Sequence, residues 1–244
     1  MKHCRHVVEF YGSDEDRIVR NVATYLTDSL RSGGAAIAVA SVAHRVPIGE
    51  TIARTEKTSL AEFGERLLLL DDGETLEELM DGDRLDAQRV ELMFGPLVGT
   101  LSARYGRLHI YGEMVGRLWR QRAFGAANEL ERIWNQLLKR FHFDLYCGYP
   151  IDVLGDDFQI PALRAVLSAH ERLMPTLDEG FDAAMRRAIG EMLGAHPDSL
   201  GSLASGNFKT LRTALPCAEG MILKLRSTLP RYADEILAKA KEYA

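Results

Sequence analysis

Cysteine is scarce in this sequence, and its scarcity excludes one class of proteins. The three cysteines, Cys4, Cys147 and Cys217, are odd in number and far apart, so they cannot form the disulfide framework of a small secreted domain. Unpaired cysteines are typical of proteins that work in a reducing compartment. The N-terminal residues also lack the apolar core of a signal peptide. We therefore expect a cytoplasmic protein.

Long hydrophobic runs and an excess of basic charge are missing as well. The longest apolar runs, residues 35–40 and 67–70, are far shorter than the roughly 20 residues that a membrane helix needs. Lys and Arg number 30 against 35 Asp and Glu, a net charge of −5, so no overall basic field attracts nucleic acid or anionic lipid. We expect no nucleic acid and no membrane among the partners.

The overall amino-acid composition is typical of a globular protein. Hydrophobic residues make up 46% and charged residues 27% of the sequence, which argues against global disorder. At about 150 residues per domain, 244 residues correspond to one sizeable domain and a smaller appendage. We expect an α/β domain over residues 1–175 and a helical region over residues 176–244.

Short apolar runs alternate with amphipathic stretches up to residue 173, a pattern that predicts a parallel sheet flanked by helices. The predicted strands are residues 6–11, 35–40, 67–70, 108–111 and 144–148. The predicted helices are residues 14–31, 74–80, 87–105, 114–121, 123–141 and 157–173. After Pro175 no strand-like run occurs, and glycines and prolines divide the sequence into three or four short helices, which suit oligomerisation or output.

A phosphate-binding loop is absent from the place where such a sheet would carry it. The segment after the first predicted strand, residues 11–17, contains one glycine, no lysine and three acidic residues. Nucleotide phosphates need backbone N–H groups exposed by glycines and a lysine that balances their charge. The acidic side chains would repel them. The sequence therefore argues against nucleotide hydrolysis.

Two segments at predicted strand ends carry candidate functional residues. Glu113 follows the fourth strand, and Cys147 with Tyr149 closes the fifth, so we expect all three at one edge of the sheet, where α/β proteins bind ligands. Glu113 and Cys147 also have structural interpretations. Glu113 would complement the dipole of the helix that it precedes, and Cys147 would fill a small buried position. A nucleophilic pair of Cys147 with a histidine stays open, although no local signature supports it.

Further candidates lie on the predicted helices. Glu131 falls at the border of an apolar stripe, so we expect it to be partly buried and paired, for instance with Arg117 or Arg120, or to reach water. His170, near the end of a predicted helix, is typical of a structural histidine. The sequence shows no Ser-His-Asp arrangement, no HExxH and no paired-cysteine spacing. It therefore predicts no catalytic residue, no metal ligand and no cofactor, while the question whether Cys147 or His6 binds a metal stays open.

Several motifs occur in a characteristic order. They are HVVEFY at 6–11, LDDGETL at 70–76, YGEMV at 111–115 with LW at 118–119, LERIWN at 130–135 and CGYP at 147–150, followed by His170. This order resembles the MEDS domain, the methanogen/methylotroph sensory domain first described in a dichloromethane-responsive regulator, over about residues 3–175. The resemblance implies a relative of the RecA/KaiC-like ATPases, a three-layer and mostly parallel sheet, without a working phosphate loop.

The resemblance also implies which residues form the site. The family's motif positions correspond here to His6, Phe10, Tyr11, Glu113, Trp119, Glu131, Cys147, Tyr149, Pro150 and His170. His6 begins the first predicted strand and is expected at the opposite edge from Glu113 and Cys147. The sequence departs from the family in the turn after Trp119, where Arg122 replaces the expected glycine.

The family is thought to sense small hydrocarbon derivatives or similar compounds, which leads to the first of three functional hypotheses. In this hypothesis the chain is a non-catalytic sensory module that binds a small, largely apolar organic ligand beyond the strand ends. Its C-terminal helices then relay binding to a signalling partner or to a second copy of the chain. The walls of that pocket would be Phe10, Tyr11, Trp119, Cys147 and Tyr149, with Glu113 orienting the ligand. The alternatives are an interaction module without a ligand and an enzyme that uses Cys147 and Glu113.

Overall fold

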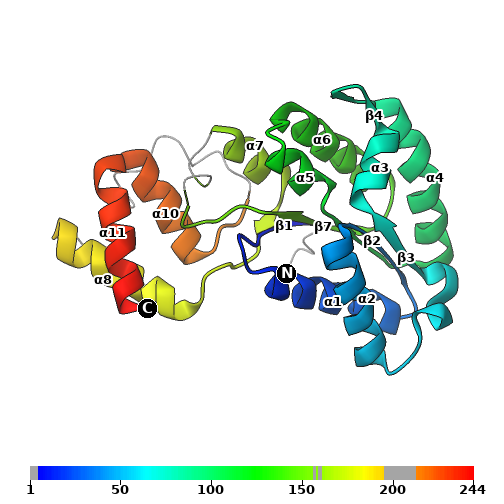
Figure 1. Cartoon of the computed structure of the whole chain (residues 1–244), viewed down its shortest axis with the longest axis horizontal. Coiled ribbons are helices and arrows are strands. Elements are labelled where there is room, and N and C mark those ends of the chain that lie inside the picture. The colour runs from blue at the N-terminus through cyan, green and yellow to red at the C-terminus, as the bar shows by residue number, and fades with distance from the viewer. Residues whose placement is uncertain (1–4, 156–157, 159–160, 195–212) are drawn as a thin grey trace. The chain divides into compact units, whose positions relative to one another are not determined.

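The computed structural model describes residues 5–155, 158, 161–194 and 213–244 (Figure 1). Its residues cluster into two compact units, Met1–Pro150 and Ile151–Ala244. The first unit is α/β and the described part of the second is mainly helical, so the chain combines a parallel sheet flanked by helices with a helical C-terminal region. Among the described helices, none is both long enough and apolar enough to cross a bilayer.

Five strands of the first unit lie side by side, and all of them are parallel. They are β1 (His6–Phe10), β2 (Ala35–Ala40), β3 (Leu67–Asp71), β6 (Leu108–Gly112) and β7 (Asp144–Tyr149). Their order in space is β3-β2-β6-β7-β1. Each begins and ends within one residue of the predicted limits, because a strand that is apolar on both faces is easily recognised in a sequence.

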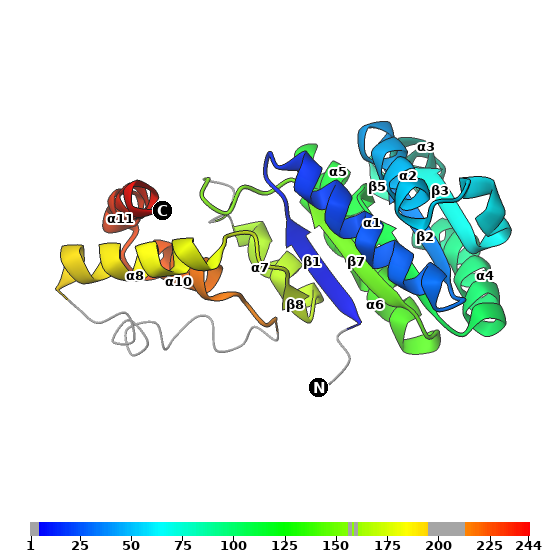
Figure 2. The same cartoon turned by 90° about the horizontal axis from the view of Figure 1, so that it is seen from below.

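Helices cover both faces of these strands. They are α1 (Glu15–Arg31), α2 (Val42–Glu56), α3 (Asp72–Leu79), α4 (Ala87–Tyr105), α5 (Met114–Arg120) and α6 (Phe124–Arg140). Figures 1 and 2 show α1 and α2 on one face of the sheet and α4, α5 and α6 on the other. The first unit therefore has the three-layer architecture that the sequence pattern predicts.

Some elements of the first unit could not be expected from the sequence. They are α2, the 3₁₀ helix Leu60–Arg66 and a small antiparallel hairpin of β4 (Met80–Asp81) and β5 (Arg84–Leu85). Pro47 lies inside α2, and a proline normally argues against a helix interior. The hairpin strands are two residues long, too short for a recognisable alternation.

The described part of the second unit contains α7 (Pro161–Ala169), β8 (Arg172–Leu173), α8 (Glu179–Leu193), α10 (Cys217–Thr228) and α11 (Pro230–Tyr243). The helix predicted over 157–173 is wrong at its end, because Arg172 and Leu173 are extended; residue 157 lies outside the described residues. The Leu173 amide donates to the Ala214 carbonyl at 3.0 Å, and the Ala214 amide donates to the backbone carbonyl of Glu171 at 2.9 Å. These partners are distant in sequence, so local periodicity could not reveal them.

Candidate functional site

Nine of the ten predicted site residues lie in the first unit, and several of them fall into two separate polar clusters. We call His6, Glu131 and Cys147 the face cluster, because these side chains lie between the sheet and α6. We call Glu113, His44 and Tyr111 the edge cluster, because it forms where β6 ends. The sequence places Glu113 and Cys147 at one edge, and the structure assigns them to different clusters.

The pleat of the sheet brings the face cluster together. Val8 of β1 is in register with Cys147 of β7, and His6 stands two residues before Val8 on the same face. His6 Nε2 lies 3.5 Å from Cys147 Sγ and 3.3 Å from Glu131 Oε2. Cys147 Sγ lies 3.8 Å from the same carboxylate oxygen. His6 does begin its strand, but the expectation that this separates it from Cys147 is wrong.

Glu131 is fully buried and paired, although not with an arginine of α5. The Tyr149 hydroxyl donates to its Oε1 at 2.8 Å, while Oε2 faces His6. Arg117 instead pairs with Asp72 at 3.4 Å. The predicted arginine partner is therefore wrong, because Glu131 faces the sheet rather than the solvent side of α5.

Three of the aromatic residues predicted to line a ligand pocket, Phe10, Trp119 and Tyr149, pack against one another beside Glu131. The ring of Tyr149 makes edge contacts with Phe10 at 6.2 Å and with Trp119 at 5.7 Å between centroids. Phe10, Tyr11, Trp119, Cys147 and Tyr149 are each less than 5% exposed. They form part of the core of the first unit. Pro150, which follows β7, is half-buried.

The same burial governs the chemistry of Cys147. Burial, followed by the negative charge of Glu131 and its hydrogen bond, raises the pKa of the Cys147 thiol well above its usual range. A nucleophilic cysteine needs the opposite, an accessible thiolate with a lowered pKa. The surroundings of Cys147 therefore disfavour a nucleophilic role.

In the edge cluster, Glu113 accepts three hydrogen bonds. The Tyr111 hydroxyl donates to Oε1 at 2.6 Å, His44 Nδ1 donates to the same oxygen, and the Ser41 amide donates to Oε2 at 3.0 Å. Burial raises the pKa of Glu113, but the bonds and charge of His44, with the other donors, outweigh burial and lower it. Glu113 is therefore held as a carboxylate.

His44 was not predicted as a site residue, although a signal for it exists. Burial lowers the pKa of His44, while the hydrogen bond and charge of Glu113 raise it above its usual value overall. Its ring also makes an edge contact with Tyr11 at 5.5 Å, and the Tyr11 hydroxyl accepts a bond from Arg120 at 2.9 Å. His44 lies in the first turn of α2, which follows β2 at the sheet edge where ligand-binding residues are expected.

Glu9 forms a further polar cluster on the opposite face of the sheet. Its buried carboxylate accepts hydrogen bonds from Asn21 at 3.1 and 3.2 Å, from Arg17 at 3.2 Å, and from the Tyr146 hydroxyl. Arg17 and Asn21 belong to α1, so these bonds join that helix to β1 and β7. These hydrogen bonds satisfy the buried carboxylate, so Glu9 serves to hold α1 against the sheet.

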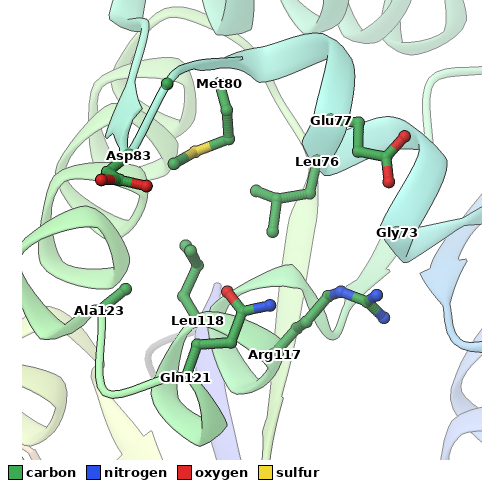
Figure 3. Close-up of a pocket in the computed structure, with 10 residues that line it drawn as sticks. Gly73, Leu76, Glu77, Met80, Asp83, Arg117, Leu118, Gln121 and Ala123 are labelled. Atoms are coloured by element: carbon green, nitrogen blue, oxygen red, sulfur yellow. The ribbon is translucent and has the colours of Figure 1, made fainter.

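A pocket of about 590 Å³ lies between α3, the β4–β5 hairpin and α5 (Figure 3). Leu76, Met80 and Leu118 project into it, and polar groups surround them. Arg117 is one of these groups, with 42% of its side chain exposed, and it pairs with the buried Asp72 at 3.4 Å. Burial raises the pKa of Asp72, although Arg117 opposes that effect. Because the hairpin was not predicted, this pocket was not predicted either.

His170, the tenth predicted residue, belongs to the second unit and follows α7 directly. It is buried, and its ring Nδ1 donates to the Val166 carbonyl at 2.7 Å. This bond satisfies one of the last carbonyls of the helix, which fits the structural role expected of a histidine at a helix end.

Comparison with known proteins agrees with the motif order. The family model described as "MEDS: MEthanogen/methylotroph, DcmR Sensory domain" matches residues 5–171. The matched segment contains all ten predicted site residues, and the resemblance drawn from the sequence is confirmed. Neither a curated protein nor a solved structure matches the chain.

Proposed function

The chain belongs to the MEDS family of sensory domains, and from that premise we propose that it binds a small, largely apolar organic ligand without catalysing a reaction on it. The ligand occupies the pocket between α3 and α5. A sensory or signalling role follows from the family itself; the pocket and the class of ligand are the new part of the proposal.

The observation that carries the proposal is the composition and place of the pocket. Three apolar side chains project into it and a few charged or polar groups surround them, as in many sites for small organic molecules. Its walls α3 and α5 begin where β3 and β6 end. The pocket therefore lies beyond the carboxyl ends of parallel strands, where ligands of α/β sheets bind.

Arg117 supplies an anchor for a polar group of the ligand. Its guanidinium reaches the pocket while it pairs with Asp72 at only 3.4 Å, which leaves other N–H donors for a ligand. A carbonyl, carboxylate or other acceptor on an otherwise apolar molecule would bind there. This chemistry favours small organic compounds with one acceptor group over pure hydrocarbons.

We assign the relay to the C-terminal helices. A ligand that binds one arrangement of a protein more tightly shifts the population towards it. The helices of the second unit would then pass this shift to a signalling partner or to a second copy of the chain. Of the two alternatives, the cysteine-dependent enzyme is disfavoured by the buried, protonated Cys147.

Thermal unfolding in the presence of small organic compounds tests the proposal. At about 100 times its dissociation constant a ligand adds about 2.7 kcal/mol of stability, which corresponds to a rise in Tm of roughly 5–10 °C. Met80→Trp places a large ring in the pocket, so we expect this variant to lose the shift caused by the same compound. Arg132→Met, on the exposed surface of α6, is the control and keeps the shift.

Two outcomes contradict the proposal. One is no shift with any compound of a broad panel, which would favour the interaction module without a ligand. The other is a shift that Met80→Trp leaves unchanged, which would move the ligand out of this pocket.

A further inference from the structure

The face cluster combines three kinds of metal-binding donor within one buried volume. An imidazole nitrogen, a carboxylate oxygen and a thiol sulfur converge from β1, α6 and β7. His6, Glu131 and Cys147 are each 1% exposed. Donor atoms of this kind that lie this close together could hold a metal ion. The ligand pocket shares none of these residues.

The spacing of the three donor atoms matches ligands around a single small ion. Tetrahedral zinc binds nitrogen and oxygen at about 2.0–2.2 Å and sulfur at about 2.3 Å, which places neighbouring donors about 3.3–3.6 Å apart. The observed separations are 3.3 Å from His6 Nε2 to Glu131 Oε2, 3.5 Å from His6 Nε2 to Cys147 Sγ, and 3.8 Å from Cys147 Sγ to Glu131 Oε2. The first two separations fall within this range, and the third is slightly longer.

Neighbouring residues orient two of the donors. Asn135 Nδ2 donates to the Glu131 carbonyl at 2.9 Å, which turns its Oδ1 towards His6. His6 Nδ1 lies 3.3 Å from that oxygen and donates to it, so Nε2 of a neutral ring presents its lone pair to the cluster. Outer hydrogen bonds of this type hold metal-binding histidines in place.

Glu131 is oriented in the same way. The Tyr149 hydroxyl occupies Oε1 at 2.8 Å, and Oε2 is the oxygen that faces His6 and Cys147. With His6 in this tautomer, its Nε2 and the Oε2 of Glu131 both face the Cys147 thiol as acceptors. A cation between them would satisfy all three at once.

We infer that His6, Glu131 and Cys147 are ligands of one zinc-class transition-metal ion. On binding, Cys147 Sγ forms a bond to the ion and releases its proton to solvent, because the thiolate is the metal ligand. Imidazole and thiolate together select zinc or a similar ion over magnesium and calcium. The three side chains leave a fourth tetrahedral position for a water molecule or another donor.

The full chain, loaded with zinc or cobalt(II), provides the test. We expect about one zinc per chain by elemental analysis and a thiolate-to-cobalt charge-transfer absorption on titration with cobalt(II). Cys147→Ser should lose that absorption and bind zinc at least about tenfold more weakly. Cys217→Ser, which changes an exposed cysteine, should behave as the wild type.

X-ray absorption at the zinc edge keeps the inference testable if Cys147→Ser does not fold. For the wild-type chain we expect one sulfur at about 2.3 Å and the remaining donors at about 2.0–2.2 Å. A folded chain that takes up neither zinc nor cobalt(II) would overturn the inference. So would a shell without sulfur, or a cobalt spectrum that Cys147→Ser leaves unchanged. None of these results depends on the ligand pocket.

Discussion

Glu113 and His44 form a buried pair whose contribution to stability depends on pH. The pKa of Glu113 is lowered on folding, so its contribution is present above its unfolded pKa, about 4.3, and is lost as the pH falls through its folded value. The pKa of His44 is raised, so its contribution is complete below about 6.5 and is lost as the pH rises through its folded value. The pair therefore stabilises the fold most between these limits.

Glu113→Gln tests this pair. We expect the variant to lose about 1–3 kcal/mol of unfolding free energy at pH 6, because the donors of His44, Tyr111 and Ser41 lose a charged acceptor. At pH 9 the difference from wild type should be smaller, because the contribution of His44 is lost as the pH rises through its folded pKa. Denaturant unfolding at the two pH values measures both differences.

A surface pair provides the control for that experiment. Glu129 pairs with Arg132 on the exposed side of α6, so Glu129→Gln should cost at most about 0.5 kcal/mol at either pH. An equal loss for Glu113→Gln at pH 6 and pH 9 would contradict the assigned role of His44.

Arg122 occupies a turn position whose backbone is left-handed. The related domains are expected to have a glycine in this turn, and Arg122 adopts a φ of 57°. That left-handed conformation costs a residue with a side chain roughly 1–2 kcal/mol, whereas glycine adopts it freely. The turn between α5 and α6 therefore places an arginine in a conformation that suits glycine.

At the scale of elements, α5 packs very closely against the end of β7. A Cβ atom at Gly116 would lie 2.5 Å from the Gly148 carbonyl oxygen and 3.0 Å from Pro150 Cδ. Backbone cannot move aside as a flexible side chain can. The small residue in α5 therefore allows the helix to approach the strand that carries Cys147 and Tyr149.

Gly116→Ala should separate these elements. We expect it to lower the unfolding free energy by about 1–3 kcal/mol, because the added methyl group overpacks a rigid contact. Gly125→Ala in α6 is the matched control, because a Cβ there meets nothing within 4 Å. The control should be neutral or slightly stabilising, since alanine favours a helix more than glycine does. Thermal unfolding of both variants measures the two changes in stability. Equal changes for Gly116→Ala and Gly125→Ala would contradict the close contact between α5 and β7.

At the scale of the whole molecule, the division into units differs from the sequence-based boundary. We predict domains over 1–175 and 176–244, while the compact units divide after Pro150. Inside the second unit, residues 170–173 bind residues 213 and 214. Leu173 donates to Ala214 at 3.0 Å, and the Thr213 hydroxyl donates to the His170 carbonyl at 3.0 Å. A cut after residue 175 removes these partners.

A chain that ends at residue 175 tests which boundary holds. We expect amide hydrogen exchange over residues 161–173 to be at least about tenfold faster than in the full chain, because several hydrogen bonds of about 1 kcal/mol each are lost. Exchange in β2, which lies far inside the first unit, should be unchanged and serves as the control. Unchanged exchange over 161–173 would instead support a self-sufficient domain over 1–175.

Five strands and most helices of the first unit follow from the sequence alone, because apolar periodicity, capping residues and turn residues act locally. The five strand limits, the exact span of α4 and the family motifs were all readable there. The sequence also marks Glu113, Glu131 and Cys147 as candidate site residues, since each is a polar or reactive group beside an apolar segment.

Which of these groups meet depends on how the strands and helices are arranged in space. His6 lies beside Cys147 because β1 pairs with β7 and both residues point to the same face, whereas Glu113 bonds to His44 in the first turn of α2. The pocket needs a hairpin whose strands are only two residues long, too short for an alternating pattern to reveal. Strand order, register and pleat arise from packing of the whole unit, and one residue of register moves a side chain to the opposite face of a sheet.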